Sequence, residues 1–543
     1  MTAPELAESP PAARVKAPPA GGRLSLRTPA LIVVALTVIG LAVRYPIARQ
    51  SLFADELSTY WISATHSLHG VLQLLYGSGK IAHAEITPPL SFLLMWLTSR
   101  AGHSPELLRL PSLIAGTATI PVVYLVGRRT VGRNGALVAA ALTTLAPFMV
   151  YYSTEARAYG LMMLAVLLST LGVLLALDTG RTRWWVLYGV SACAAFYLHY
   201  TSVFVLAVQF VWVMWSQPSA RRPLVIATVI AALGVVPWIP GLINDYRSPT
   251  LNILSALAPF TPFYVRYYLE HWALGYPLAL TLTLVPGVVA LIALGCSAVV
   301  AIVGVIVSWH GSFKARLAAV DRRVLLVAAL ALTTPVGAAL ESAVSNSIFS
   351  ARNLAASWPY LALTYAALLT ASRRWFSWVA SGLAIAALAI GTIKALGTTF
   401  ERPDYQGAAA YVTSHARPGD VVIDATGVLS PGPLTGFDAA YRGRLPVFRA
   451  DSPAERGHPY TVFDRDVPLS QAIRRAVAAA AGHRVFLVTS VFNTPITQLA
   501  ARSGSVRSQF GGSYRLANER RFPGIGGTVV AVYSDARADG SGD

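Results

Sequence analysis

The chain has 543 residues, of which 55% are hydrophobic and 13% are charged. A soluble globular protein carries roughly 25% charged residues, so this composition excludes an ordinary soluble enzyme and indicates that lipid surrounds most of the chain. Lys and Arg exceed Asp and Glu by 43 to 25. Because the basic residues gather in short loops between apolar segments, we interpret the excess as the positive-inside pattern and expect no binding of nucleic acid.

The N-terminal segment and the two cysteines are interpreted from their composition and surroundings. Residues 1–28 are rich in Pro, Ala and basic side chains, which predicts a disordered cytoplasmic tail. The apolar run after them lacks a convincing cleavage site and is long enough to cross a bilayer, so we expect an uncleaved helix. Cys193 and Cys296 fall in apolar runs and are interpreted as buried thiols, not as a disulfide or a metal site.

Apolar runs of about 20 residues, the length that crosses a bilayer, predict about eleven transmembrane helices and therefore a mainly α, polytopic fold. The expected helices are residues 29–47, 107–127, 134–152, 158–177, 184–199, 201–216, 223–243, 278–308, 324–343, 353–372 and 375–396. The chain shows no internal repeat, which argues against a transporter built from duplicated halves.

Basic residues occupy every second loop between these helices. The pairs are Arg128 and Arg129, Arg181 and Arg183, Arg221 and Arg222, Arg322 and Arg323, and Arg373 and Arg374. This alternation predicts a multi-pass protein of the cell membrane with a cytoplasmic N-terminus and an external C-terminus. Residues 29–399 would form the transmembrane domain, with residues 48–106 as a large external loop.

Beyond about residue 400 the composition becomes that of a soluble domain. Apolar strand-like runs at 421–423, 485–488 and 528–533 alternate with helix-like segments at 404–415 and 474–481. Residues 400–543 are therefore expected to form an external, periplasmic-side α/β domain.

Residues able to carry chemistry gather on the external side of this predicted topology. Charged groups near hydrocarbon are costly, so they are usually kept for binding or catalysis. Acids beside arginines favour a site in which a carboxylate takes a proton from an acceptor hydroxyl and a guanidinium neutralises a phosphate leaving group. The candidates are Asp55, Glu56, His83, Glu85, Glu155, Arg157, His199 and Arg352.

Several short motifs occur in a particular order along the first 200 residues. They are Asp55-Glu56, Thr87-Pro88-Pro89-Leu90, Arg109-Leu110-Pro111-Ser112, the segment Tyr152 to Tyr159 with Glu155-Ala156-Arg157, and Leu198-His199-Tyr200. In these motifs and their spacing the chain resembles the bacterial protein O-mannosyltransferase and aminoarabinose transferase superfamily, which are membrane glycosyltransferases of the GT-C fold. The resemblance covers about residues 29–400. Aminoarabinose transferases carry Lys directly before the Pro-Pro pair, where this chain has Thr87, and this departure argues against modification of lipid A.

The resemblance implies an inverting glycosyltransferase. It would move one hexose or pentose from a polyprenyl-phosphate donor to a hydroxyl acceptor on the external membrane face. Asp55 would be the general base, and Glu155 a second catalytic acid that orients the acceptor or a metal. Arg157 and Arg352 would hold the lipid phosphate.

The same motifs supply further candidate residues. Glu56, His83, Tyr159 and His199 are expected to bind substrate, and Glu85 is a candidate ligand of a divalent metal ion. No other cofactor is expected. The sugar, the need for a metal and the acceptor (cell-envelope or cell-wall glycan, lipid or protein) are left open.

Two other functions remain compatible with the sequence. An envelope polysaccharide ligase or polymerase would also use external arginines and a polyprenyl carrier, but it would depend less on an acid after the first helix. A transporter of lipid-linked glycans would place charged groups near the bilayer midplane, whereas the charges here lie mostly at the external helix ends.

Overall fold

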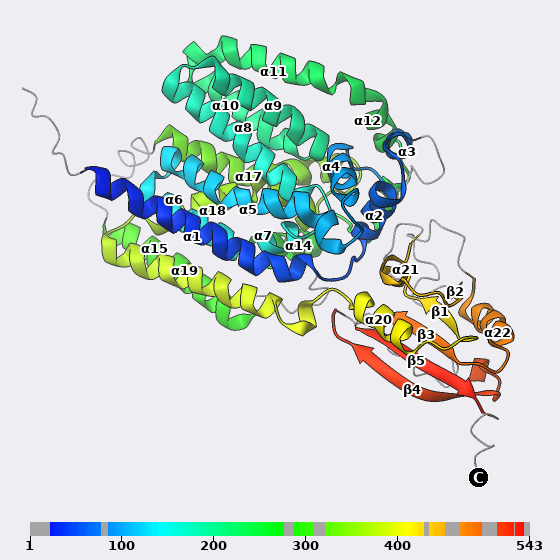
Figure 1. Cartoon of the computed structure of the whole chain (residues 1–543). Coiled ribbons are helices and arrows are strands. Elements are labelled where there is room, and N and C mark those ends of the chain that lie inside the picture. The colour runs from blue at the N-terminus through cyan, green and yellow to red at the C-terminus, as the bar shows by residue number, and fades with distance from the viewer. Residues whose placement is uncertain are drawn as a thin grey trace, which may run out of the picture.

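The fold consists of a helical bundle and a small sheet domain. The computed structural model describes residues 22–77, 85–275, 287–308, 321–427, 434–450, 467–490, 508–525 and 527–536. The long helices lie side by side, and the sheet domain adjoins one end of the bundle (Figure 1). The predicted polytopic, mainly α fold with a C-terminal α/β domain is confirmed.

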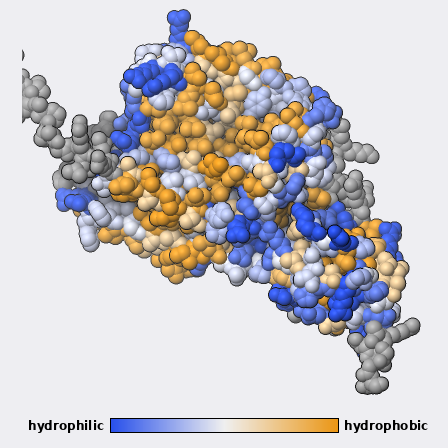
Figure 2. Space-filling model, in the orientation of Figure 1, coloured by the Kyte–Doolittle hydropathy of each residue, from blue (hydrophilic) through white to orange (hydrophobic). Residues whose placement is uncertain are grey.

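A helix overlaps each predicted transmembrane range. The principal helices are α1 (Gly22–Ala48), α5 (Pro105–Thr130), α6 (Gly132–Leu145), α8 (Tyr159–Thr179), α9 (Thr182–Leu198), α10 (Ser202–Ser216), α11 (Arg221–Val235), α15 (Val288–Val307), α17 (Arg322–Val344), α18 (Trp358–Leu369) and α19 (Arg374–Ala395). Seven helical segments in the described chain are long and apolar enough to cross a membrane. Figure 2 shows hydrophobic residues over the bundle and more hydrophilic residues over the sheet domain.

Three predicted details change. The helix α1 begins at Gly22, before the expected start at residue 29, and residues 1–21 of the expected tail lie outside the described residues. The range 134–152 is divided into α6 and α7 (Pro147–Tyr152), because a proline inside a helix removes a backbone hydrogen bond. Cys193 is only half-buried, and Cys296 is exposed.

The exposure of Cys296 corrects the prediction that both thiols are buried. Cys296 lies on α15, where Val289, Ile292 and Val299 are also exposed. A helix in lipid turns apolar side chains outward, so an apolar run predicts exclusion from water but not burial within the protein.

The large loop after α1 forms three helices at the same end of the bundle as the sheet domain (Figure 1). They are α2 (Asp55–Thr65), α3 (Leu68–Leu75) and α4 (Leu90–Ser99). Ser67 lies between α2 and α3 and caps α3 by accepting a hydrogen bond from the Gly70 N–H at 3.2 Å.

The C-terminal domain contains a five-stranded sheet in the order β2-β1-β3-β5-β4. Its strands are β1 (Val421–Ala425), β2 (Val447–Arg449), β3 (Val485–Ser490), β4 (Tyr514–Phe522) and β5 (Thr528–Asp535). The first three are parallel, and β5 is antiparallel to both β3 and β4. Residues of α20 (Tyr405–His415) and α21 (Gly436–Ala440) pack on one face, and those of α22 (Leu469–Ala480) pack on the other.

The packing of α8 against α9 yields a prediction about stability. A Cβ atom on Gly172 of α8 would lie 2.8 Å from the Tyr188 nitrogen and 3.0 Å from the Trp184 oxygen, whereas one on Gly295 of α15 would meet nothing within 4 Å. Gly172→Ala should therefore destabilise the protein by roughly 1–3 kcal/mol, and Gly295→Ala should not. Thermal unfolding in detergent measures both, and equal melting temperatures would contradict this account of the helix contact.

Candidate active site

Glu56, in the first turn of α2, is buried, and both of its carboxylate oxygens accept hydrogen bonds. Arg109 of α5 donates from Nε to Oε1 at 2.7 Å and from Nη2 to Oε2 at 2.6 Å. The backbone N–H groups of Ala156 and Phe53 donate to the same two oxygens at 2.8 and 3.2 Å. Burial raises the pKa of Glu56, but Arg109 and Arg402 together hold it below its usual value.

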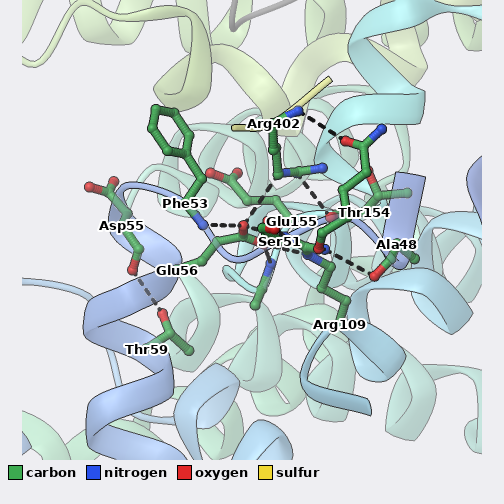
Figure 3. A network of polar contacts seen from close by, with 12 residues as sticks. Ala48, Ser51, Phe53, Asp55, Glu56, Thr59, Arg109, Thr154, Glu155 and Arg402 are labelled. Carbon is green, nitrogen blue, oxygen red and sulfur yellow. Dashed lines mark hydrogen bonds and ion pairs between the residues drawn. The ribbon is translucent and has the colours of Figure 1, made fainter. Parts of the chain in front are cut away.

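Arg402 is the second guanidinium on this carboxylate and comes from the segment between α19 and α20. Its Nε lies 3.3 Å from the Glu56 Oε2, and both side chains are about 1% exposed. Its Nη2 donates to the Thr154 carbonyl at 3.1 Å, and the guanidinium lies 5.1 Å from the centre of the Tyr151 ring. Figure 3 shows Arg109 and Arg402 approaching Glu56 from different directions.

The turn before α2 directs its two adjacent acids apart. Ala54 has φ 51° and ψ −127°, a conformation that favours glycine and costs a non-glycine residue on the order of 1–3 kcal/mol. After this residue, Glu56 points toward Arg109 while Asp55 points away from it (Figure 3). The strained residue Ala54 is therefore followed by an accessible acid, Asp55, and then by a buried acid, Glu56.

Asp55 forms an ion pair with Arg352, which lies in the 3-10 helix η3 (Ala351–Ser357). The Asp55 Oδ2 and the Arg352 Nη1 are 2.6 Å apart. The side chains are 28% and 31% exposed, so this pair is reachable, whereas Glu56 is not. The structure thus brings together a carboxylate and a guanidinium that are 297 residues apart in the chain.

Arg157 binds Glu85 through both of its terminal guanidinium nitrogens. Its Nη1 and Nη2 donate to the two Glu85 carboxylate oxygens at 2.9 and 3.0 Å. The same nitrogens donate to the Thr59 and Thr87 hydroxyls at 3.2 and 2.9 Å. Bidentate pairs of this kind fix the relative orientation of the two side chains. Arg157 therefore joins the segment after Glu155 to α2 and to the residues just before α4.

Glu155 lies in the irregular segment between α7 and α8. The Tyr151 hydroxyl donates to its Oε1 at 3.4 Å. Its Oε2 has no hydrogen-bond partner within the described part of the chain. Burial, together with the negative charges of Glu56 and Asp55, raises the pKa of Glu155 to about 8. Near neutral pH this carboxyl group therefore holds a proton that it can donate.

Of the other predicted site residues, Tyr159 and His199 lie close to each other. The rings of Tyr159 and His199 are 5.4 Å apart, and the His199 Nδ1 lies 3.0 Å from the Thr201 hydroxyl oxygen. His83 lies outside the described residues. The structure brings the remaining predicted residues into three adjoining groups, which are Asp55 with Arg352, Glu85 with Arg157, and Glu155 beside Glu56.

Sequence reasoning missed the contribution of two arginines. Arg109 stood within a recognised motif, and its position at the start of an apolar helix was a signal that it pairs with an acid. Arg402 carried no comparable signal, because it lies in a short polar segment at a domain boundary and only the fold brings it to Glu56.

Within the described residues, no metal cluster is found near these side chains. In the residues that the structure describes, no group of three or more His, Cys, Asp or Glu side chains lies together, and Glu85 is engaged by Arg157, so metal binding by Glu85 stays a prediction. A cavity of about 360 Å³ lies between the loop and the C-terminal domain, lined in part by Leu52, His103, Gln406 and Arg442. No predicted site residue lines it.

Comparison with known proteins shows what this chain is similar to. A family model described as dolichyl-phosphate-mannose-protein mannosyltransferase matches residues 87–240, the part of the chain that contains Glu155, Arg157, Tyr159 and His199. The resemblance expected from the motifs is thereby confirmed over residues 87–240, and the solved structures confirm the GT-C fold. A comparison with curated proteins gives no match.

Solved structures show the same fold along nearly the whole chain. ArnT from Cupriavidus metallidurans in the apo state is 14% identical with a TM-score of 0.51, covering 94% of this chain and 98% of that one. ArnT bound to undecaprenyl phosphate is also 14% identical, with a TM-score of 0.50 and coverage of 93% and 97%. The Archaeoglobus fulgidus oligosaccharyltransferase tethered to an acceptor peptide is 12% identical, with a TM-score of 0.50 and coverage of 94% and 74%.

The raised pKa of Glu155 predicts a pH dependence of stability. Between about pH 4.5 and 8 the folded protein keeps a proton on Glu155 that the unfolded chain releases. Stability should therefore be greatest below this window and fall as the pH rises through it, by up to about 1.4 kcal/mol per pH unit, and then level off. Melting temperatures of wild type and Glu155→Gln, measured in detergent from pH 5 to 9, isolate this contribution. Parallel curves for the two proteins would contradict it.

Proposed function

We propose that the protein is an inverting glycosyltransferase that moves one monosaccharide from a polyprenyl phosphate to a hydroxyl acceptor. The observation that carries the proposal is the accessible Asp55–Arg352 pair beside the buried Glu56. It puts a proton acceptor and a phosphate-binding cation side by side, as this reaction requires. The GT-C fold supports the proposal.

In the proposed reaction Asp55 takes the proton of the acceptor hydroxyl. The acceptor oxygen attacks the anomeric carbon from the face opposite the lipid phosphate, and a new glycosidic bond forms with inversion. The bond from the anomeric carbon to the phosphate oxygen breaks, and its electron pair leaves with the polyprenyl phosphate. Arg352 stabilises the negative charge that develops on this leaving group.

The contacts refine the roles expected for the arginines and for Glu56. Arg157 gives both terminal nitrogens to Glu85 and two threonines, so binding of phosphate there would break a bidentate pair. We therefore assign the phosphate mainly to Arg352 and give Arg157 a positioning role. Glu56, being buried between two arginines, positions Asp55 and does not bind substrate.

Glu155 is proposed to act as a neutral acid. Its raised pKa, about 8, keeps it protonated near neutral pH, and its Oε2 has no partner in the described chain. It would donate a hydrogen bond to the acceptor or to a phosphate oxygen. Tyr159 and His199 would line the sugar site beside it.

The proposed placement in the membrane follows the basic loops. The N-terminus would be cytoplasmic, and the loop with Asp55 and the domain from residue 400 onward would lie outside. The acceptor is then a component of the cell envelope, whether glycan, lipid or protein. The need for a divalent metal is tested by adding and chelating the ion in the transfer assay.

The first activity prediction concerns the proposed base. Asp55→Asn should reduce sugar transfer by at least about 100-fold, because general-base catalysis typically contributes 10²–10⁴-fold. Transfer is measured with purified protein in lipid, a panel of radiolabelled polyprenyl-phosphate monosaccharides and candidate acceptors. Asp178→Asn is a matched control, since Asp178 is 29% exposed and pairs with Arg323 at 2.5 Å. Full activity of Asp55→Asn would remove Asp55 as the base.

The second activity prediction concerns the phosphate. Arg352→Gln should raise the KM for the donor and lower kcat, because the charge it supplies acts on both bound donor and leaving group. Arg323→Gln, which alters an arginine of similar exposure in another ion pair, should leave both constants unchanged. If folded wild-type protein consumes no donor with any acceptor, the transferase proposal fails. A transporter of lipid-linked glycans then becomes the better explanation.

A further inference from the structure

The segment that leads into the C-terminal domain contacts the turn that holds Asp55, the proposed base. The backbone N–H of Arg402 donates to the Gln50 Oε1 at 3.2 Å, and the Gln406 N–H donates to the Ser51 hydroxyl at 3.0 Å. Both acceptors lie in the chain just before Asp55. Arg402 itself reaches past them to Glu56. The start of the C-terminal domain thus contacts the same short turn by backbone and by side chain.

That turn needs support because Ala54 adopts a backbone conformation that favours glycine. The Glu56 carboxylate accepts a hydrogen bond from the Phe53 N–H across this turn. The position of the carboxylate therefore determines whether the turn keeps its conformation. Arg109 fixes one side of this carboxylate from within the bundle. Arg402 fixes it from the C-terminal side of the chain.

We propose that Arg402 is a positioning residue, through which docking of the C-terminal domain sets the geometry of Asp55. This inference rests on the proposed function of Asp55. Without Arg402, Glu56 would keep one guanidinium, the turn at Ala54 would relax, and Asp55 would no longer be held beside Arg352. The bundle would then retain its donor site but lose an oriented base.

The C-terminal domain has the contacts needed for this dependence. Ile525 donates its N–H to the Glu401 carbonyl at 2.7 Å, and Asp404 donates its N–H to the Pro523 carbonyl at 3.2 Å. A Cβ atom on Gly524 would lie 2.6 Å from the Arg402 carbonyl oxygen. Residues 523–525, directly after β4, therefore contact the backbone on both sides of the Arg402 side chain, and a movement of the sheet domain would move Arg402.

The first test separates positioning from general damage to the fold. Arg402→Gln should lower kcat by about tenfold and leave the donor KM within about twofold, because the donor site is intact. Arg442→Gln is the control, since Arg442 also joins the C-terminal domain to the loop, donating to the Tyr60 hydroxyl at 3.4 Å, but does not touch Glu56. It should leave both constants unchanged.

The second test uses the strained residue itself. Ala54→Gly removes the conformational cost of the turn, so adding it to Arg402→Gln should restore kcat by about threefold. Added to Asp55→Asn, it should restore nothing. If Arg402→Gln does not fold, Arg402→Lys, which keeps the buried charge, is combined with Ala54→Gly in the same comparison.

The third test does not depend on activity. Hydrogen exchange of a peptide covering residues 50–57 should be faster in Arg402→Gln than in wild type and unchanged in Arg442→Gln. Unchanged exchange and unchanged kcat in Arg402→Gln would overturn the inference, even if Asp55→Asn is inactive. Faster exchange in Arg402→Gln with a fully active Asp55→Asn would instead overturn the proposed function and leave the support of the turn established.

Discussion

The structure around the candidate site depends on one buried interaction, the Glu56 carboxylate held by Arg109 and Arg402. A buried carboxylate is costly unless it is paired and hydrogen-bonded, and here two guanidiniums and two backbone N–H groups meet that need. Removal of one partner from such a pair typically costs about 3–5 kcal/mol. The interaction joins the loop, the bundle and the C-terminal segment at a single point.

Two neighbouring acids acquire different roles from this arrangement. Glu56 is enclosed, while Asp55, one residue earlier, remains accessible and faces Arg352. The residue that separates their directions is Ala54, whose backbone is strained. Strain of this kind persists only where the surroundings over-determine it, and it is common at functional sites. The two ion pairs are equally short, but the buried one is structural, and the accessible one is the candidate for chemistry.

The sequence predicted the helices well because a bilayer imposes a length and an apolar character on each of them. The C-terminal strands β1 and β3 were also visible, since both are short and apolar. Strand β4 was missed because it lies at an edge of the sheet and carries charged residues such as Glu519 and Arg520. The sequence singled out Asp55, Glu56 and Glu155 as candidates, but it did not predict the pairing of Glu56 with Arg402, because contacts across 346 positions follow from the fold and not from local patterns.

Binding of a polyprenyl-phosphate sugar to Asp55→Asn, followed by single-turnover transfer, separates the role of Asp55 in chemistry from donor binding. If Asp55 is the base, the variant should bind the donor with a Kd within about twofold of wild type and transfer none of the bound sugar, because the carboxylate acts on the acceptor and not on the donor. Normal transfer of bound sugar by Asp55→Asn would contradict the assignment of the base. Loss of donor binding alone would show that Asp55 holds the donor, and the proposed division between Asp55 and Arg352 would be wrong.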